Sequence, residues 1–155
     1  MARVFCVANQ KGGVGKTTTT VNLAAGLALA GQRVLMVDLD PQGNATMGSG
    51  IDKRALALSV YDVLLESASM AEARVRSEKG GYDLLGANRE LAGAEVELVQ
   101  LERRDQRLRA ALQAVAGDYD FVLIDCPPSL GLLTINALTA ADAVSWVSRT
   151  IGRPV

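Results

Sequence analysis

The chain has 155 residues, of which 49% are hydrophobic, so it can bury one sizeable core and is too short for two domains to be expected. We therefore expect a single domain over residues 1–155. Sixteen basic and seventeen acidic residues leave a formal net charge of −1, which excludes the overall positive field that attracts proteins to nucleic acid without specificity.

Short apolar runs alternate with longer helical patterns along the chain. The expected helices cover residues 17–30, closed by Gly31, then a short helix over 59–73 and a long amphipathic helix over 90–116. Residues 43–53 and 77–81 are expected as loops. The expected strands are residues 4–8, 33–37, 82–85, 121–124 and 143–147. This alternation predicts an α/β fold, a parallel β-sheet with helices on both faces.

The two cysteines, Cys6 and Cys126, stand far apart and neither belongs to a CxxC pair. This pattern argues against a zinc site or a disulfide framework, so we expect two small buried thiols in a reducing cytosol. No apolar run is long enough for a signal peptide or a membrane span. The sequence therefore predicts a soluble cytoplasmic protein.

Residues 9–20 read NQKGGVGKTTTT and join an expected strand to an expected helix. The stretch nearly matches the phosphate-binding pattern GxxxxGK[ST], with Gln10 in place of the first glycine and an additional lysine, Lys11. Backbone N–H groups at the glycines can face an anion, and the helix start adds the positive end of its dipole. Lys16 would reach the β- and γ-phosphates, and the Thr17 hydroxyl would help to coordinate Mg²⁺. The glycines are Gly12, Gly13 and Gly15.

Three aspartates end two of the expected strands. Asp125 closes the apolar run FVLID and looks like a Walker B aspartate that holds Mg²⁺ directly or through water; the alternative is a capping residue before a Pro-Pro turn. Asp38 and Asp40 in VDLDPQGNAT are two residues apart and so lie on the same side of an extended chain. One or both should point at the phosphates, although DPQG also suits a plain turn in which Asp40 bonds back to the backbone.

Together these stretches resemble the ParA/Soj-type partition ATPases, members of the deviant Walker A family of P-loop NTPases that also contains MinD and the nitrogenase iron protein. The matching stretches are KGGVGKTT at 11–18, DLDPQGNAT at 38–46, LAGAEVEL at 91–98 and DCPPSLG at 125–131. The resemblance runs from about residue 3 to about residue 144. DLDPQGN followed by DCPPSLG is the version found in chromosome and plasmid partition proteins.

The resemblance implies cofactors and roles for individual residues. ATP would contact residues 11–18, including Val14 and Thr18, and Mg²⁺ would lie near Thr17, Asp38 and Asp125. Lys11 would cross to the nucleotide of a second copy, as an arginine finger does in GTPases, which answers why this loop carries an extra lysine. Asp40 matches the carboxylate that positions the attacking water, so Lys11, Lys16 and Asp40 are the expected catalytic residues.

The resemblance further implies a weak ATPase that a partner stimulates. ATP favours a homodimeric sandwich, the dimer binds DNA without sequence preference, and a ParB-type centromere-binding protein stimulates hydrolysis and releases it. The implied role is segregation of chromosomes or plasmids in the cytoplasm, at the nucleoid and away from membranes.

Residues 145–155, SWVSRTIGRPV, do not resemble the family. We therefore expect a nucleotide-binding fold that is family-like over 1–144 and incomplete at its C-terminus, with DNA binding a property of the intact protein. A second interpretation is a nucleotide-binding module without turnover. A third is a MinD-like membrane-cycling ATPase or an electron-transfer ATPase, which would need a terminal amphipathic helix or cluster-ligating cysteines that the sequence lacks.

A basic cluster lies on the long expected helix at Arg103, Arg104, Arg107 and Arg109, interleaved with Glu102 and Asp105. Opposite charges at close helical spacing usually form a solvated, salt-bridged face, and we expect one here.

Overall fold

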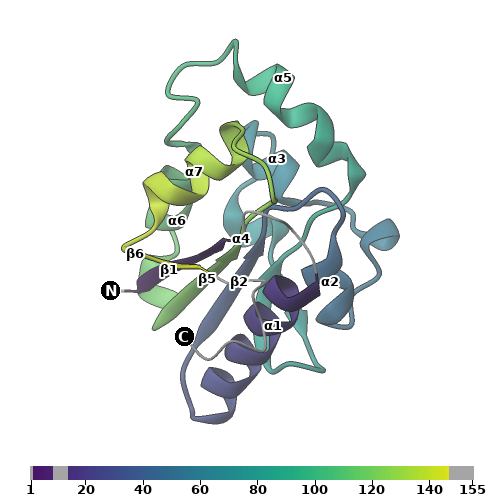
Figure 1. The fold of residues 1–155 in the computed structure, drawn as a ribbon, viewed down its shortest axis with the longest axis vertical. Helices are drawn as coiled ribbons and strands as arrows, with labels where there is room; N and C mark the ends of the chain where they lie inside the picture. Colours follow the sequence, from purple (N-terminus) through teal and green to yellow (C-terminus); the bar gives the residue numbers. More distant parts are fainter. Residues whose placement is uncertain (1, 9–13, 147–155) are drawn as a thin grey trace.

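The computed structural model describes residues 2–8 and 14–146, and its strands form one sheet (Figure 1). The strands are β1 (Arg3–Ala8), β2 (Val34–Asp38), β3 (Val75–Ser77), β4 (Tyr82–Leu85), β5 (Phe121–Asp125) and β6 (Ala143–Trp146). Their order across the sheet is β3-β4-β2-β5-β1-β6. Every neighbouring pair is parallel except the antiparallel pair β3–β4. The predicted α/β architecture with a parallel sheet is confirmed.

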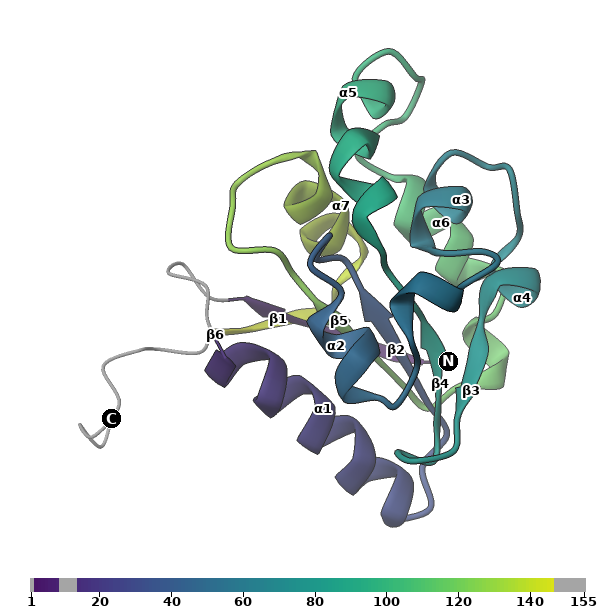
Figure 2. The ribbon, with the colours of Figure 1, turned by 90° about the vertical axis from the view of Figure 1, so that its right-hand side faces the viewer.

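Helices cover both faces of the sheet. On one face, α1 (Val14–Leu29) packs on Val34 and Met36, and the alternate residues Leu35 and Val37 face a larger core on the other side. Ala45 of α2 (Asn44–Gly48) joins this smaller core, and Figure 2 shows α1 below the sheet and the longer run of helices above it. That larger core involves α3 (Val60–Leu64), α4 (Met70–Ala73), α5 (Ala94–Leu98), α6 (Arg107–Gln113) and α7 (Leu132–Ala140).

The five expected strands are present within one residue of their predicted bounds, and the first helix begins three residues before its predicted start and ends one residue before its predicted end. Val147, the last residue of the fifth expected strand, lies outside the described residues. The edge strand β3 was missed because it has only three residues, and only Ser77 among them is buried. It returns to β4 through a turn in which Gly81 has φ +76°, a conformation that glycine adopts without strain.

The prediction of one helix over 90–116 is wrong. The segment consists of η2 (Arg89–Gly93), α5, an irregular stretch, α6 and η3 (Ala116–Asp118). Asn136 of α7 explains the break, because its Oδ1 accepts the Leu108 N–H at 3.1 Å and its Nδ2 donates to the Arg104 carbonyl at 2.7 Å. These bonds satisfy backbone groups that a continuous helix would pair internally.

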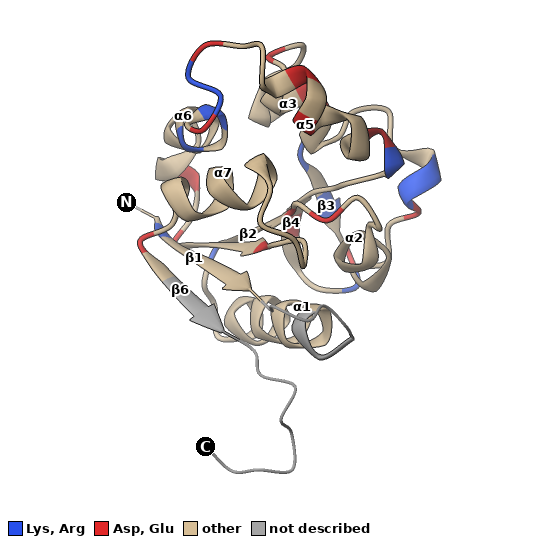
Figure 3. Ribbon diagram, turned by 45° about the horizontal axis from the view of Figure 1, so that its top comes forward, with Lys and Arg blue, Asp and Glu red and all other residues tan. Residues whose placement is uncertain are grey.

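The arginines around this break do not form the expected ladder of ion pairs with their acidic neighbours. Arg104 donates to the Val99 carbonyl, and Arg107 donates to the Glu102 carbonyl and lies 3.5 Å from a carboxylate oxygen of Glu66. Figure 3 shows the basic positions gathered in the loop before α6 and on α6 itself. Arg104 and Arg107 thus bind mainly backbone carbonyls.

Two further segments differ from their predictions. Residues 43–53, expected as a loop, contain α2 (Asn44–Gly48) and the start of η1 (Lys53–Ala55). The single helix expected over 59–73 is divided into α3 and α4, each opened by a capping box, with Ser59 and Ser69 as N-caps. The first helix ends at Leu64, shortly before Glu66 with φ +62°, and the N-cap at Ser69 starts the second. Within the described ranges, no helix has the length and apolarity needed to span a bilayer.

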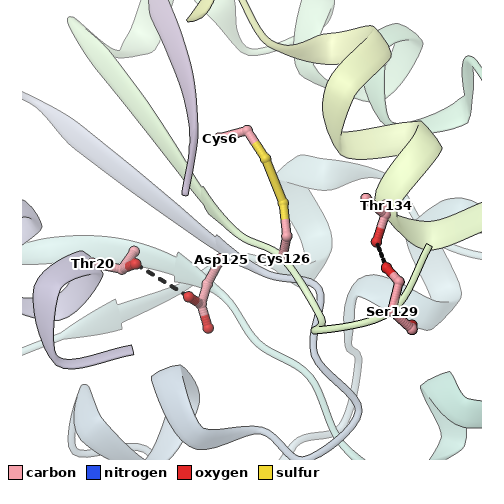
Figure 4. Close-up of a disulfide and its surroundings, with 6 residues drawn as sticks. All are labelled: Cys6, Thr20, Asp125, Cys126, Ser129 and Thr134. Atoms are coloured by element: carbon pink, nitrogen blue, oxygen red, sulfur yellow. Dashed lines mark hydrogen bonds between the residues drawn. A yellow bond between two sulfur atoms is a disulfide. The ribbon is translucent and has the colours of Figure 1, made fainter. Parts of the chain in front are cut away.

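The cysteines are buried as expected, but the prediction of free thiols is wrong. Cys6 on β1 and Cys126, directly after β5, are both fully buried and form a disulfide (Figure 4). The two cysteines are 120 positions apart in the sequence, but β1 and β5 are neighbours in the sheet with Val7 opposite Asp125.

Candidate nucleotide site at the carboxyl edge of the sheet

The parallel strands bring two carboxylates together at one edge of the sheet. Asp38 ends β2, Asp125 ends β5, and the two residues are direct partners in the β2–β5 register. Both are fully buried. Backbone hydrogen bonds also join the strand ends here. The Asp125 carbonyl accepts the Leu39 N–H at 2.9 Å, and the Cys126 N–H donates to the Val7 carbonyl at 3.1 Å.

Helix α1 contributes hydroxyl groups to Asp125. The Thr20 hydroxyl donates to Oδ1 at 3.1 Å, as Figure 4 shows, and the Thr17 hydroxyl donates to Oδ2 at 3.4 Å. Residues 17 and 20 are three apart and therefore share one face of the helix. The first turns of α1 are thus attached to the carboxylate that ends β5.

Asp38 accepts three hydrogen bonds from its own segment. Its Oδ1 accepts the Asp40 N–H at 3.0 Å, and its Oδ2 accepts both the N–H and the hydroxyl of Thr46, at 2.9 and 2.7 Å. Burial, and next the negative charge of Asp125, raise the pKa of Asp38 to about 7, although the three hydrogen bonds act in the opposite direction.

Asp40 lies in a tight turn next to this pair and is only 7% exposed. Its Oδ1 accepts the Gln42 N–H at 3.0 Å, and its carbonyl accepts the Gly43 N–H at 2.8 Å. The turn expected as an alternative for DPQG is therefore present. It engages one carboxylate oxygen of Asp40, and within the described residues Oδ2 accepts no hydrogen bond, so the turn is compatible with a role toward a ligand.

The glycine-rich loop is only partly described. Lys11, Gly12 and Gly13 lie outside the described residues. Val14 and the residues that follow it form the start of α1 through their backbone, three residues before the expected start at Thr17. Thr18 is exposed, whereas Thr17 is half-buried against Asp125.

The donor atoms at this edge are oxygens. The Asp125 carboxylate and the Thr17 hydroxyl lie side by side, and hard cations such as Mg²⁺ prefer such ligands. In the described part of the chain, no three His, Cys, Asp or Glu side chains gather as a metal cluster. The arrangement suits Mg²⁺, which commonly takes one or two protein ligands and completes its coordination with phosphate and water.

Two buried threonines escaped the sequence analysis. Thr20 donates to Asp125, and Thr46 donates to Asp38; both are fully buried. The signal for Thr20 was its spacing of three residues from Thr17. Thr46 sits in a segment that was predicted to be a loop, so nothing in its spacing indicated a contact with the strand end.

A protein-family model described as an AAA domain (AAA_31) matches residues 2–150. The chain is 54% identical to the sporulation initiation inhibitor protein Soj of Bacillus subtilis over 144 residues, which are 93% of the chain and 57% of that protein. It is also 54% identical to the chromosome partitioning protein ParA of Caulobacter vibrioides, covering 92% of the chain and 54% of that protein. The chain thus spans little more than half the length of these curated relatives.

Solved structures share the fold. A cobyrinic acid a,c-diamide synthase from Mycobacterium smegmatis, crystallised with an ATP analog and magnesium, superposes with a TM-score of 0.91 at 48% identity, covering 98% of the chain and 65% of that protein. A plasmid partition protein from Borrelia burgdorferi superposes with a TM-score of 0.81 at 26% identity, covering 94% of the chain and 65% of that protein.

Proposed function

The chain belongs to the AAA domain family whose model matches residues 2–150, and we propose that it is the nucleotide-binding part of a partition ATPase of the ParA/Soj type. It would bind ATP with Mg²⁺ and hydrolyse it weakly until a partner stimulates turnover. Its identity to Soj and ParA supports this role. The single domain would occupy residues 1–155.

One observation carries the proposal. Asp125 ends β5 beside Asp38 and is held by hydroxyls from the first turns of α1. Anionic ligands of open α/β sheets bind outside the carboxyl ends of the strands, and a helix that starts there attracts phosphate. The site therefore places oxygen ligands for a cation next to the position where a polyphosphate would bind.

Each residue of the glycine-rich stretch then has a proposed role. The backbone around Gly12, Gly13 and Gly15 would surround the phosphates, and Lys16 would contact the β- and γ-phosphates. Thr17 and Asp125 would hold Mg²⁺, with Asp38 buried behind them. When bound, Mg²⁺ neutralises charge on the phosphate oxygens. The relative crystallised with an ATP analog and magnesium supports this cofactor pair.

Asp40 would orient the attacking water through the carboxylate oxygen that its own turn leaves available. Lys11 would act on the nucleotide of a second copy, so that hydrolysis requires a homodimer. In the full-length protein the dimer would bind DNA and respond to a ParB-type protein at the nucleoid in the cytoplasm.

Calorimetry tests nucleotide binding directly. We expect a non-hydrolysable ATP analogue to bind only with Mg²⁺, and Lys16→Ala to abolish binding. Lys79→Ala is the matched control. Lys79 is an exposed lysine in the turn that precedes β4, at the amino end of that strand, whereas the site lies at the carboxyl ends of the strands. Absence of magnesium-dependent binding by the folded parent would refute the proposal.

Complementation tests the role of Lys11 in a second copy. Lys11→Ala and Asp40→Ala should each bind ATP and hydrolyse none. When the two variants are mixed in equal amounts, half of the dimers contain one Lys11→Ala subunit and one Asp40→Ala subunit. In such a dimer one of the two sites combines an intact Asp40 with an intact Lys11 from the other subunit. About a quarter of the parent activity should therefore return. No recovery from a mixture that forms mixed dimers would exclude Lys11 from acting across the interface.

The solved relative named cobyrinic acid a,c-diamide synthase supports a second candidate, an ATP-dependent amide synthesis. Its 48% identity over 98% of the chain is the observation in favour. ATP hydrolysis that rises with DNA and a ParB-type protein would support partition. ATP consumption that requires a carboxylic acid and an amide-nitrogen donor would support the synthase.

A further inference from the structure

The hydroxyl of Thr46 lies between the end of β2 and the backbone that follows β4. Thr46 belongs to α2 and is fully buried. Its Oγ1 is 2.7 Å from Oδ2 of Asp38 and 3.0 Å from the backbone nitrogen of Ala87. One small side chain therefore connects α2, the strand end that carries Asp38, and the segment leading out of β4.

The chemistry of these groups fixes the direction of each hydrogen bond when Asp38 is ionised. A carboxylate only accepts, and the backbone N–H of Ala87 only donates. The single hydroxyl proton of Thr46 must then point at Asp38, while its oxygen accepts from Ala87. The Thr46 N–H donates to the same carboxylate oxygen at 2.9 Å, so Oδ2 is held from two directions.

The other carboxylate oxygen of Asp38 is hydrogen-bonded to the backbone of Asp40. Oδ1 accepts the Asp40 N–H at 3.0 Å. A carboxylate is a rigid plane, so fixing Oδ2 also fixes Oδ1 and the backbone of residue 40 that donates to it. The order of contacts runs from Ala87 to Thr46, then to Asp38 and finally to Asp40.

We propose that Thr46 is a positioning residue for ATP hydrolysis, whose hydroxyl orients Asp38 so that Asp38 holds Asp40 in place for the attacking water. The inference rests on the proposed function, because it needs Asp40 to act on a nucleotide. Thr46 is fully buried and its hydroxyl is engaged by Asp38 and Ala87, so it would act through Asp38 and not on the nucleotide itself. A displacement of about 1 Å in a positioned group can lower a rate on the order of a hundredfold, so the loss of one hydroxyl is sufficient.

The alternative is that the Thr46 hydroxyl only stabilises the fold, and Ser77 supplies the matched control. The Ser77 hydroxyl is also fully buried, donates to the Ser49 carbonyl at 2.6 Å and accepts the Gly80 N–H at 3.0 Å. Like the Thr46 hydroxyl, it donates one hydrogen bond and accepts one from a backbone N–H, but its acceptor is a backbone carbonyl instead of a carboxylate. It lies on the edge strand β3, which does not contact Asp38 or Asp125.

Thr46→Val keeps the shape of the side chain and removes both hydroxyl bonds. We expect its kcat for ATP to fall about 10- to 100-fold while KM changes less than about twofold. Thr46→Ser retains the hydroxyl and should restore most of kcat, and Ser77→Ala should leave kcat near the parent value. If Thr46→Val does not fold, Thr46→Ala replaces it, because the smaller side chain leaves space for a water that can accept the Ala87 N–H. We expect the same fall in kcat for Thr46→Ala.

Amide hydrogen exchange gives a readout that does not depend on the nucleotide. The Asp40 N–H should exchange at least about tenfold faster in Thr46→Val than in Ser77→Ala, because only the first change frees Asp38. Equal exchange in the two variants overturns the inference, and so does a kcat that is unchanged or falls equally in both. If the parent fails to bind Mg²⁺ and ATP, the proposed function fails instead, and the exchange comparison still decides whether Thr46 positions Asp40.

Discussion

The folded chain should lose stability as the pH rises from about 5 to about 8, because Asp38 resists ionisation in its buried site. Asp38 is fully buried beside Asp125, and its pKa is raised to about 7 from the ordinary 3.8. A raised acid pKa means that the folded state keeps the proton to higher pH than the unfolded state. The stabilising effect is complete below pH 3.8 and is lost as the pH rises through 7.

The size of the effect follows from the two pKa values. Between about pH 5 and pH 8 the free energy of unfolding should fall by about 3 kcal/mol. The chain contains no histidine, so no side chain with an ordinary pKa titrates in the middle of this range. The α-amino group also titrates near this range, so a slope of this sign is assigned to a buried acid only if Asp38→Asn removes it.

Urea denaturation across this pH range, with EDTA present, measures the slope. Asp38→Asn cannot ionise and should remove it. Asp83→Asn is the control and should keep the slope, since Asp83 is a half-buried carboxylate that bonds to Tyr119 and Arg76 away from the site. A direct NMR titration of the Asp38 carboxyl carbon checks the assignment if Asp38→Asn does not fold. A flat stability profile in the parent would refute the reasoning.

Three further changes test the packing. A Cβ at Gly131 would collide with the Glu95 carboxylate, which accepts the Leu133 N–H at 3.0 Å, so Gly131→Ala should displace Glu95 and lower stability in urea by about 1 kcal/mol. Gly26→Ala, at an exposed position in the last turn of α1 where an added Cβ meets nothing within 4 Å, should instead raise stability by about 0.5 kcal/mol. Tyr119→Phe removes bonds to Asp83 at 2.6 Å and Arg74 at 2.8 Å and should lower the thermal midpoint, with a stability loss of about 1–3 kcal/mol.

The strands could be predicted because each depends on its own residues. All five residues of β2 are buried, and such a run in an α/β chain reads as a central parallel strand whatever surrounds it. The break in the long helix could not be predicted, because Asn136 decides it from another helix. Local periodicity continued from Leu98 to Leu108, and only the tertiary contact shows that both leucines reach the core without one helix joining them.

The same distinction applies to the site. Asp38 and Asp125 were predictable because strand ends of a parallel sheet meet at one edge, and the register confirms that they are partners. The contact between Thr46 and Ala87 joins segments 41 residues apart and depends on α2, which was predicted as a loop. The disulfide between Cys6 and Cys126 was missed because it depends on the order of the strands rather than on cysteine spacing.

The three aspartates of this edge have the same side chain in three different environments. Asp125 accepts hydroxyls from α1, Asp38 accepts bonds from its own segment, and Asp40 uses one oxygen in a turn. Burial, and next the charge of Asp125, make the ionised form of Asp38 unfavourable and raise its pKa, and a cation at the site would lower that pKa. A ligand that binds only the folded state also stabilises it. Magnesium-nucleotide would therefore stabilise the fold most at the higher pH values, where Asp38 is ionised and the repulsion with Asp125 is largest.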